Sequence, residues 1–182
     1  MKFLPTRLPD VVLIEPEVHG DQRGFFMETW HARKFVAAGI DATFVQDNHS
    51  RSIQGTLRGL HLQARQPQGK LIRVVAGEMF DVVVDLRKDS PTFRRWVGCT
   101  LSAANRHQLW VPPGFAHGFY TLSDAAEIIY KCTDFYAPEH ERILRWDDPD
   151  LAVHWPLMPG QSPILSAKDA AGVPLRELVA SL

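Results

Sequence analysis

Apolar and polar residues alternate over several short stretches of the chain, with the period of a half-buried β-strand. The clearest stretch is Met79–Arg87, in which every second residue is apolar: Phe80, Val82, Val84 and Leu86. The run before it, Leu71–Ala76, and the short connection Gly77-Glu78 predict that the two strands form a hairpin. Further strands are predicted at Val11–Ile14, Phe25–Met27, Ala42–Gln46, Leu57–Gln63, Trp96–Leu101, His107–Val111, Gly118–Leu122 and Glu127–Tyr136.

Only two stretches have the periodicity of a helix. The first is Trp30–Ala38, with Thr29 as the expected N-cap and Gly39 just past its end. The second is Pro174–Ala180, whose apolar face is formed by Leu175, Leu178 and Val179. About ten short strands and so few helices predict an all-β fold, and the length suits a jelly-roll barrel with short peripheral helices. Asp147–Lys168 has four prolines and little periodicity, so we expect an extended tail that wraps the barrel.

Length and composition are those of one globular domain, which we expect to span residues 1–182. Twenty Lys and Arg against 21 Asp and Glu give a net charge of -1. This balance excludes a protein whose whole surface binds a nucleic-acid polymer or an anionic membrane. No apolar run approaches the roughly 18 residues of a membrane span, and the N-terminus lacks the apolar stretch of a signal peptide. Two cysteines, Cys99 and Cys132, are too few for a disulfide framework, so we expect reduced thiols and a cytoplasmic protein.

The charges are distributed unevenly along the chain. Between Asn48 and Gly77 there is no acidic residue, whereas Asp134–Asp150 holds six acids. The acid-free block contains five cations: Arg51, Arg58, Arg65, Lys70 and Arg73. One hypothesis is that these cations bind a small anion such as a diphosphate, which arginine contacts through paired donors. The alternative, which charge alone favours, is a solvated sheet face with ion-pair partners in the acidic segment.

His61 lies inside this block, in Arg58-Gly59-Leu60-His61-Leu62. A histidine between leucines on a strand is more often a core residue than a catalyst, but the nearby cations Arg58 and Lys70 keep a catalytic role open. Strict alternation places Arg58 and His61 on opposite faces of the strand, because their spacing is odd. Both can reach one cavity only if the strand bulges, and Gly59 is the expected position of the bulge.

A second histidine, His117, follows the turn Pro112-Pro113-Gly114 at the start of a strand. This arrangement resembles the second half of the two-part motif of cupin barrels. In metal-binding cupins the first half supplies two histidines one residue apart and a glutamate. Here His61 has no such neighbour, and the next glutamate is Glu78. Two histidines are fewer than a stable metal site needs, so we expect a cupin-like barrel without a metal.

Two tyrosines and the end of the tail are ambiguous on their own. Tyr130 follows two isoleucines on a predicted strand, and Tyr136 lies six residues later. Either tyrosine could pack in the core with its hydroxyl bonded locally. Leu165–Asp169 has the pattern of a surface turn.

Taken together and in this order, these motifs resemble the dTDP-4-dehydrorhamnose 3,5-epimerase family. The matching stretches cover almost the whole chain: Asp21–Glu28, Gln46–Ser50, Leu57–Leu62, Pro67–Val75, Pro112–Phe119, Tyr130–Glu141 and Leu165–Asp169. The resemblance implies a homodimer that epimerises a dTDP-linked 4-keto-6-deoxy sugar at C3 and C5 without a metal or nucleotide cofactor. Three alternatives stay open: a mono-epimerase acting at C3 or C5 only, a metal-dependent cupin enzyme, and a barrel that only binds a nucleotide sugar.

The resemblance also implies catalytic roles. Removal of a proton next to a ketone requires a base, stabilisation of the enolate oxygen and reprotonation from the opposite face. His61 matches the family's base, and Asp169 matches the carboxylate paired with it. Lys70 matches the cation near the ketone oxygen, and Tyr130 matches the acid that delivers a proton to the other face.

Substrate-binding positions follow from the same resemblance. Those that hold the diphosphate and sugar are matched by Gln46, Asn48 and Arg58. An aromatic residue near the nucleotide and a histidine lining the cavity are matched by Tyr136 and His117. The positions that bind the thymidine, in the family from the partner subunit, are matched by Arg23, Phe26 and Glu28. A site shared in this way implies a homodimer.

Overall fold

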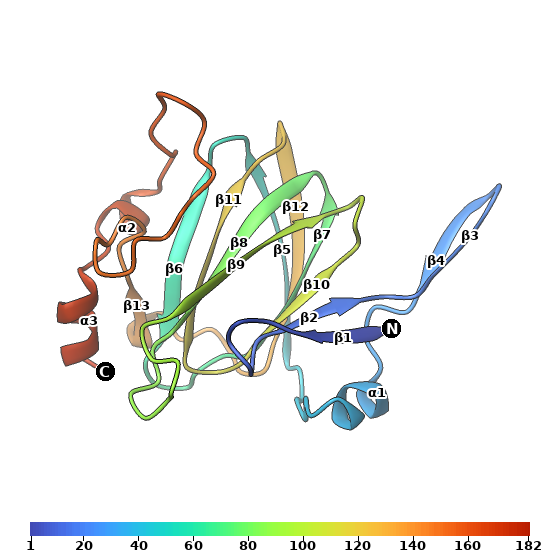
Figure 1. The fold of residues 1–182 in the computed structure, drawn as a ribbon, viewed down its shortest axis with the longest axis horizontal. Helices are drawn as coiled ribbons and strands as arrows, with labels where there is room; N and C mark the ends of the chain where they lie inside the picture. The colour runs from blue at the N-terminus through green and yellow to red at the C-terminus, as the bar shows by residue number, and fades with distance from the viewer.

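Two antiparallel sheets pack face to face and form a jelly-roll barrel (Figure 1). The computed structural model describes residues 1–182. The strand order of the six-stranded sheet is β1 (Lys2–Pro5), β2 (Val12–Glu15), β10 (Gln108–Val111), β7 (Lys70–Ala76), β12 (Ala125–Cys132) and β5 (Gln46–Ile53). The order of the five-stranded sheet is β13 (Glu141–Ile143), β6 (Leu57–Gln63), β11 (Phe115–Thr121), β8 (Glu78–Asp85) and β9 (Trp96–Ser102). The predicted all-β, cupin-like fold is confirmed.

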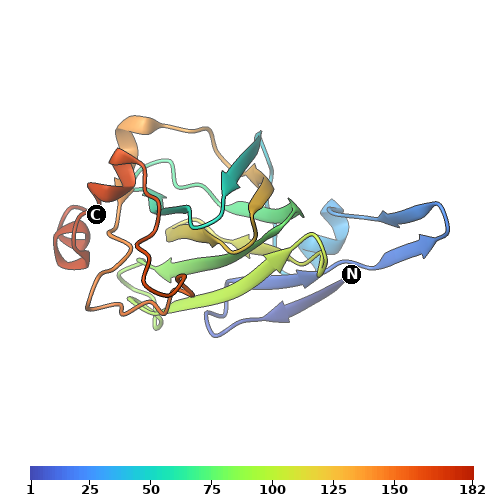
Figure 2. The same cartoon turned by 90° about the horizontal axis from the view of Figure 1, so that it is seen from above.

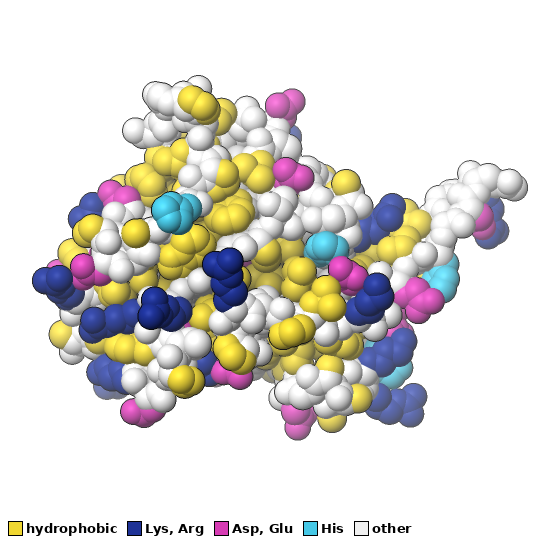
Figure 3. Space-filling view, in the orientation of Figure 1, with side chains coloured by type: hydrophobic (Ala, Val, Ile, Leu, Met, Phe, Trp, Pro, Cys, Tyr) yellow, Lys and Arg dark blue, Asp and Glu magenta, His cyan; other side chains and the backbone are white.

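A separate hairpin of β3 (Val18–Asp21) and β4 (Gly24–Met27) projects away from the barrel (Figures 1 and 2). The helices are short: α1 (Ala32–Ala37), the 3₁₀ turn η1 (Pro138–His140), α2 (Ala167–Ala170) and α3 (Leu175–Ala180). None of them has the length and hydrophobicity that crossing a membrane requires. Lysines and arginines are interspersed with acidic side chains over the face shown in Figure 3, in keeping with the net charge of -1.

Apolar side chains are buried in three layers. The layer between the two sheets, which we call the central core, consists of Leu8, Val11, Ile72, Val74, Met79, Val83, Leu101, Leu109, Val111, Phe115, Phe119 and Ile128. The outer face of the six-stranded sheet is covered by α1, which buries Phe35 against Trp110. The outer face of the five-stranded sheet is covered by the tail, whose Leu175 and Leu178 pack with Val82 and Val84. The apolar side predicted for β8 faces the tail, but the strand is not half-buried, because Met79 and Val83 on its other side pack in the central core and Asp81 and Asp85 are fully buried.

The predicted hairpin around Gly77 is wrong. β7 pairs with β10 and β12 in one sheet, whereas β8 pairs with β9 and β11 in the other. The connection takes the chain across the corner of the barrel, with Gly77 at φ +73°. A Cβ at Gly77 would lie 1.9 Å from the carbonyl oxygen of Ala125, so this corner requires glycine.

The predicted strand at Ala42–Gln46 is also wrong, because β5 begins at Gln46 and runs to Ile53. Its inward-facing residues are polar: Gln46, Asn48, Ser50 and Ser52. A strand without apolar residues on its inner face has no alternation of the usual kind. β12 ends at Cys132, four residues before the predicted end, and Asp134–Ala137 form a loop.

Both predicted helices are present, with a different cap on the first. α1 is capped by His31 instead of Thr29, and no side chain bonds to its first amides. α3 starts at Leu175 after Pro174 and buries Leu175 and Leu178, as its apolar face predicted.

Candidate active site

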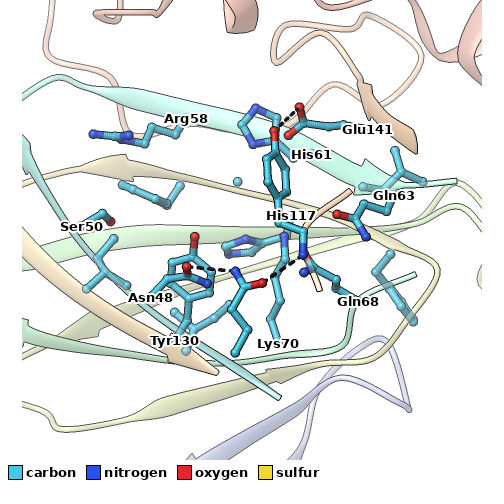
Figure 4. Close-up of a pocket in the computed structure, with 18 residues that line it drawn as sticks. Asn48, Ser50, Arg58, His61, Gln63, Gln68, Lys70, His117, Tyr130 and Glu141 are labelled. Carbon is cyan, nitrogen blue, oxygen red and sulfur yellow. Dashed lines mark hydrogen bonds between the residues drawn. The ribbon is translucent and has the colours of Figure 1, made fainter. Parts of the chain in front are cut away.

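A cavity of about 330 Å³ lies between the two sheets and is lined by both of them (Figure 4). The six-stranded sheet contributes polar side chains from three neighbouring strands: Gln46, Asn48, Ser50, Lys70 and Tyr130. The five-stranded sheet contributes the facing wall: Arg58, His61, Gln63, His117 and Glu141. Four members of the central core also line the cavity: Ile72, Phe115, Phe119 and Ile128. The polar pocket thus borders directly on the central core.

A bulge in β6 brings Arg58 and His61 to the same side of the strand. His61 pairs with His117 and Arg58 pairs with Phe119, so two residues of β6 lie opposite the single residue Gly118. Gly59 is at φ +125°, and a Cβ there would lie 2.5 Å from the Cα of Gly118. The bulge expected at Gly59 is confirmed, and both side chains line the cavity.

His61 forms a dyad with Asp169, which reaches it from the C-terminal tail. Nε2 of His61 lies 2.6 Å from Oδ1 of Asp169, and the same oxygen accepts the N–H of Gly59 at 3.1 Å. Ser166, the N-cap of α2, accepts the backbone N–H of Asp169 and donates to its Oδ2 at 2.6 Å. The segment expected to be a surface turn is therefore a capped helical turn that holds a buried carboxylate.

These hydrogen bonds decide the charge of the dyad. Burial raises the pKa of Asp169, but the hydrogen bonds from His61, Ser166 and Gly59 outweigh it and lower the pKa to about 2. Asp169 is therefore ionised at neutral pH and accepts a hydrogen bond from Nε2–H of His61. This arrangement leaves the Nδ1 lone pair of His61 free to act as a base.

Lys70 and Tyr130 lie on the opposite wall, on the adjacent strands β7 and β12. Lys70 is not among the lysines that form ion pairs. Burial lowers the pKa of Lys70, against the opposing effect of Cys132, Asp81 and Glu141. Burial raises the pKa of Tyr130, so the phenol keeps its proton at neutral pH. The cavity therefore holds a proton acceptor on one wall, and a lysine amine and a proton donor on the other.

His117 forms a second histidine–carboxylate pair in the same cavity. Its Nε2 lies 2.9 Å from Oδ2 of the fully buried Asp81, whose Oδ1 has no hydrogen-bond partner. His61 and His117 are thus each bonded to their own carboxylate, and no group of three or more His, Cys, Asp or Glu side chains is arranged to hold a metal ion. Both cysteines are free thiols, as expected.

The cationic block divides between the cavity and the surface. Arg58 and Lys70 reach the cavity, where Nε of Arg58 donates to Oγ of Ser52 at 3.0 Å. Arg51 lies on the outer face, 3.7 Å from Glu127, which is outside the acidic segment. Two of the five cations are therefore placed to bind an anion, which the charge pattern alone did not favour.

Two residues that the sequence did not single out adjoin Tyr136 at the mouth of the cavity. The Tyr136 hydroxyl donates to Glu141 Oε2 at 3.3 Å and accepts from Lys168 Nζ at 3.2 Å. Lys168 and Glu141 also form an ion pair. The only sequence feature that could have identified them is their position, because Glu141 and Lys168 lie inside two of the stretches that carry the family resemblance.

Three predicted site residues lie outside the cavity of this chain. Arg23, in the turn of the β3–β4 hairpin, pairs with its own neighbour Asp21 at 2.6 Å. Phe26 is 69% exposed on the same hairpin. Glu28 accepts a hydrogen bond from Lys34 at 2.7 Å. A single chain therefore does not bring these residues to His61.

Comparison with known proteins gives a consistent result. A protein-family model described as dTDP-4-dehydrorhamnose 3,5-epimerase matches residues 5–177. A dTDP-4-dehydrorhamnose 3,5-epimerase from Pseudomonas aeruginosa is 58% identical over 173 residues, which cover 94% of both chains. One from Neisseria gonorrhoeae is 58% identical over 172 residues, and the match covers 94% of this chain but only 52% of that longer relative.

A solved structure is similarly close. The dTDP-6-deoxy-D-glucose-3,5-epimerase of Legionella pneumophila, in complex with dTDP-4-keto-L-rhamnose, superposes with a TM-score of 0.95. The two chains are 51% identical, and the match covers 99% of this chain and 95% of that one.

Proposed function

The chain belongs to the dTDP-4-dehydrorhamnose 3,5-epimerase family, and on this premise we propose that it converts dTDP-4-dehydro-6-deoxy-D-glucose to dTDP-4-dehydro-L-rhamnose. The observation that supports this reaction most directly is the placement of a histidine base opposite a protonated tyrosine, with a lysine beside the tyrosine. Inversion at a carbon next to a ketone needs these three functions at one site.

His61 acts first, as the base. Its Nδ1 takes the proton from the carbon next to the C4 ketone, and the electron pair of the broken C–H bond moves into an enolate. Asp169, ionised and bonded to Nε2, stabilises the imidazolium that forms and holds the ring in one orientation.

Lys70 stabilises the enolate. The charge that develops on the C4 oxygen is placed near the Lys70 side chain, which as an ammonium group has no ion-pair partner to displace. Reprotonation then comes from Tyr130, on the opposite wall from His61. Delivery from that side places the new C–H bond on the face from which the original proton did not leave, which inverts the centre.

The remaining cavity residues bind the nucleotide part of the substrate. Arg58 contacts the diphosphate through its guanidinium donors, and Tyr136 provides an aromatic surface for the thymine ring. Gln46, Asn48 and His117 complete the polar lining. We assign no step to a metal or a nucleotide cofactor.

The active form is proposed to be a homodimer. The β3–β4 hairpin extends away from its own barrel (Figures 1 and 2), with Phe26 exposed and Arg23 far from any cavity residue of its chain. A partner subunit's hairpin would supply the thymidine contacts that a single chain lacks. The cytoplasmic location expected from the sequence stays a prediction.

The test is proton exchange with solvent. Enzyme and substrate are incubated in D₂O, and NMR reads deuterium at C3 and C5 of the sugar. We expect deuterium at both carbons. Exchange at one carbon only would identify a mono-epimerase, and exchange at neither would refute the proposed reaction. A metal-dependent cupin reaction would require the purified protein to contain stoichiometric metal.

A further inference from the structure

Three glutamines from different parts of the chain form hydrogen bonds to the backbone of one short loop. The loop, Asp134–Ala137, joins β12 to η1 and carries Tyr136. Gln46 of β5 accepts the backbone N–H of Tyr136 at 2.9 Å. Gln68, just before β7, donates to the carbonyl of Asp134 at 2.8 Å. Both glutamines also line the cavity.

Gln63 makes the largest number of these contacts. Its Oε1 accepts the N–H of Ala137 at 2.8 Å, and its Nε2 donates to the carbonyls of Phe135 at 3.2 Å and Gln66 at 2.7 Å. The side chain is buried, two residues beyond His61 on β6. Figure 4 shows Gln63 and Gln68 on the same side of the cavity. With three of its four hydrogen-bonding positions used, Gln63 has little capacity left for a substrate.

Among the side chains of the loop only that of Ala137 is buried. None of its residues belongs to a strand or helix, and the side chains of Phe135 and Tyr136 are 62% and 49% exposed. Apolar burial therefore does not determine where the Tyr136 ring lies. Glu141 and Lys168 hold the hydroxyl of Tyr136. The glutamines fix the position of the backbone at and beside this residue.

We propose that Gln46, Gln63 and Gln68 are positioning residues that hold Tyr136 where it stacks on the nucleotide, with Gln63 as the principal one. The role of Tyr136 rests on the proposed function, but the tethering of the loop does not. By fixing the loop before substrate arrives, the three amides remove an ordering cost from binding.

The tethering is tested first without substrate, by backbone amide hydrogen exchange measured with NMR. Gln63→Met keeps the length and bulk of the side chain and removes its polar atoms. Exchange at the amide of Ala137 should accelerate by about tenfold or more, whereas the amide of Tyr136, still bonded to Gln46, should change less. Gln54→Met is the matched control, because Gln54 donates to the carbonyl of Leu122 at 2.8 Å away from the cavity. An unchanged rate at Ala137 in Gln63→Met would overturn the proposal.

The consequence for binding is tested by a double-mutant cycle. Gln63→Met should raise KM for the dTDP-sugar about tenfold and change kcat by less than about twofold. In a Tyr136→Ala background it should raise KM no further, because the residue it positions is gone. An equal increase in both backgrounds would show that Gln63 acts independently of Tyr136 and would refute the assignment. Gln68→Met removes a single hydrogen bond and gives the same test at smaller amplitude if Gln63→Met does not fold. If the wild-type protein incorporated no deuterium at C3 or C5 of the sugar, the proposed reaction would be refuted, but the result of the amide hydrogen exchange would still hold.

Discussion

His61 and Asp169 are 108 positions apart in the sequence, and their side chains meet at 2.6 Å. The tail that carries Asp169 crosses the outer face of the five-stranded sheet before α2 turns the carboxylate toward β6. The proposed base and the carboxylate bonded to it therefore come from distant parts of the chain. Docking of the tail completes the histidine–aspartate dyad.

Asp169→Asn should reduce deuterium incorporation at both carbons by about two to four orders of magnitude, with little change in KM. Asparagine matches the carboxylate in size but provides no negative charge to stabilise the imidazolium of His61. Exchange rates in D₂O under saturating substrate measure the effect. Ser166→Ala, which leaves the carboxylate in place, should lose less, and a full exchange rate in Asp169→Asn would contradict the role given to the dyad.

Tyr130→Phe should impair net inversion more than proton removal, because removal is assigned to His61 and delivery to Tyr130. The measurement compares deuterium incorporation into remaining substrate with the formation of the epimerised product. Phenylalanine preserves the packing of this side chain against the central core, so folding should be unaffected. Equal loss of both processes would contradict separate base and acid groups.

Mixed dimers should recover activity from two impaired variants, Arg23→Ala and His61→Ala. Half of randomly reassembled dimers contain one chain of each kind, and each of these has one intact site, so about a quarter of wild-type activity should return. Each variant is refolded alone as a control. Failure to recover activity on mixing, or a monomeric mass in solution, would refute the shared site.

Asp85→Asn should lower the free energy of unfolding at pH 7 by about 2 kcal/mol. Burial raises the pKa of Asp85, but hydrogen bonds from Arg87, Ser90 and Thr92 lower it to about 2. Since the folded-state pKa lies below the unfolded value of about 3.9, the charge stabilises the fold above that value and ceases to do so as the pH falls through 2.

The difference between wild type and Asp85→Asn should therefore narrow between pH 4 and 2, as followed by urea unfolding. Asp89→Asn, at an exposed position in the same turn, is the control and should change little. A difference that stays constant with pH would show that the carboxylate charge is not responsible.

Gly59→Ala should destabilise the protein by about 3 kcal/mol or more, because the new Cβ meets the backbone of Gly118 at a left-handed φ. Gly24→Ala is the matched comparison: Gly24 is at φ +136°, but its Cβ would have nothing within 4 Å. It should lose only about 1–2 kcal/mol. Thermal or urea unfolding of both variants separates the cost of the backbone conformation from the cost of the contact between the new Cβ and Gly118. Equal losses of unfolding free energy in the two variants would show that this contact is not a cause.

The pattern of apolar and polar residues predicted the elements that bury an apolar face. β6 has the predicted bounds, and α3 buries the two leucines that its periodicity indicated. The bulge at Gly59 was also predictable, because an odd spacing between two residues meant for one cavity has few solutions. β5 was not, since its inner face contacts a polar cavity and not the core.

Partners distant in sequence were beyond local pattern. The short connection at Gly77 is compatible with a hairpin and with a corner between sheets, and only the pairing of β7 with β12 and of β8 with β11 decides between them. The roles of His61 and Asp169 came from family resemblance, because nothing in the tail itself indicates that a carboxylate there reaches β6. The glutamine contacts to Asp134–Ala137 depend on three segments far apart in the sequence meeting at one loop, which no local spacing predicts.

Four residues of the central core, Ile72, Phe115, Phe119 and Ile128, also form part of the cavity wall. Their combined volume sets the separation between the sheet that bears His61 and the sheet that bears Tyr130. Core packing thus acts as a spacer between proton removal and proton delivery. Substitutions that change the volume of these apolar side chains would therefore shift His61 relative to Tyr130 even though both residues were retained.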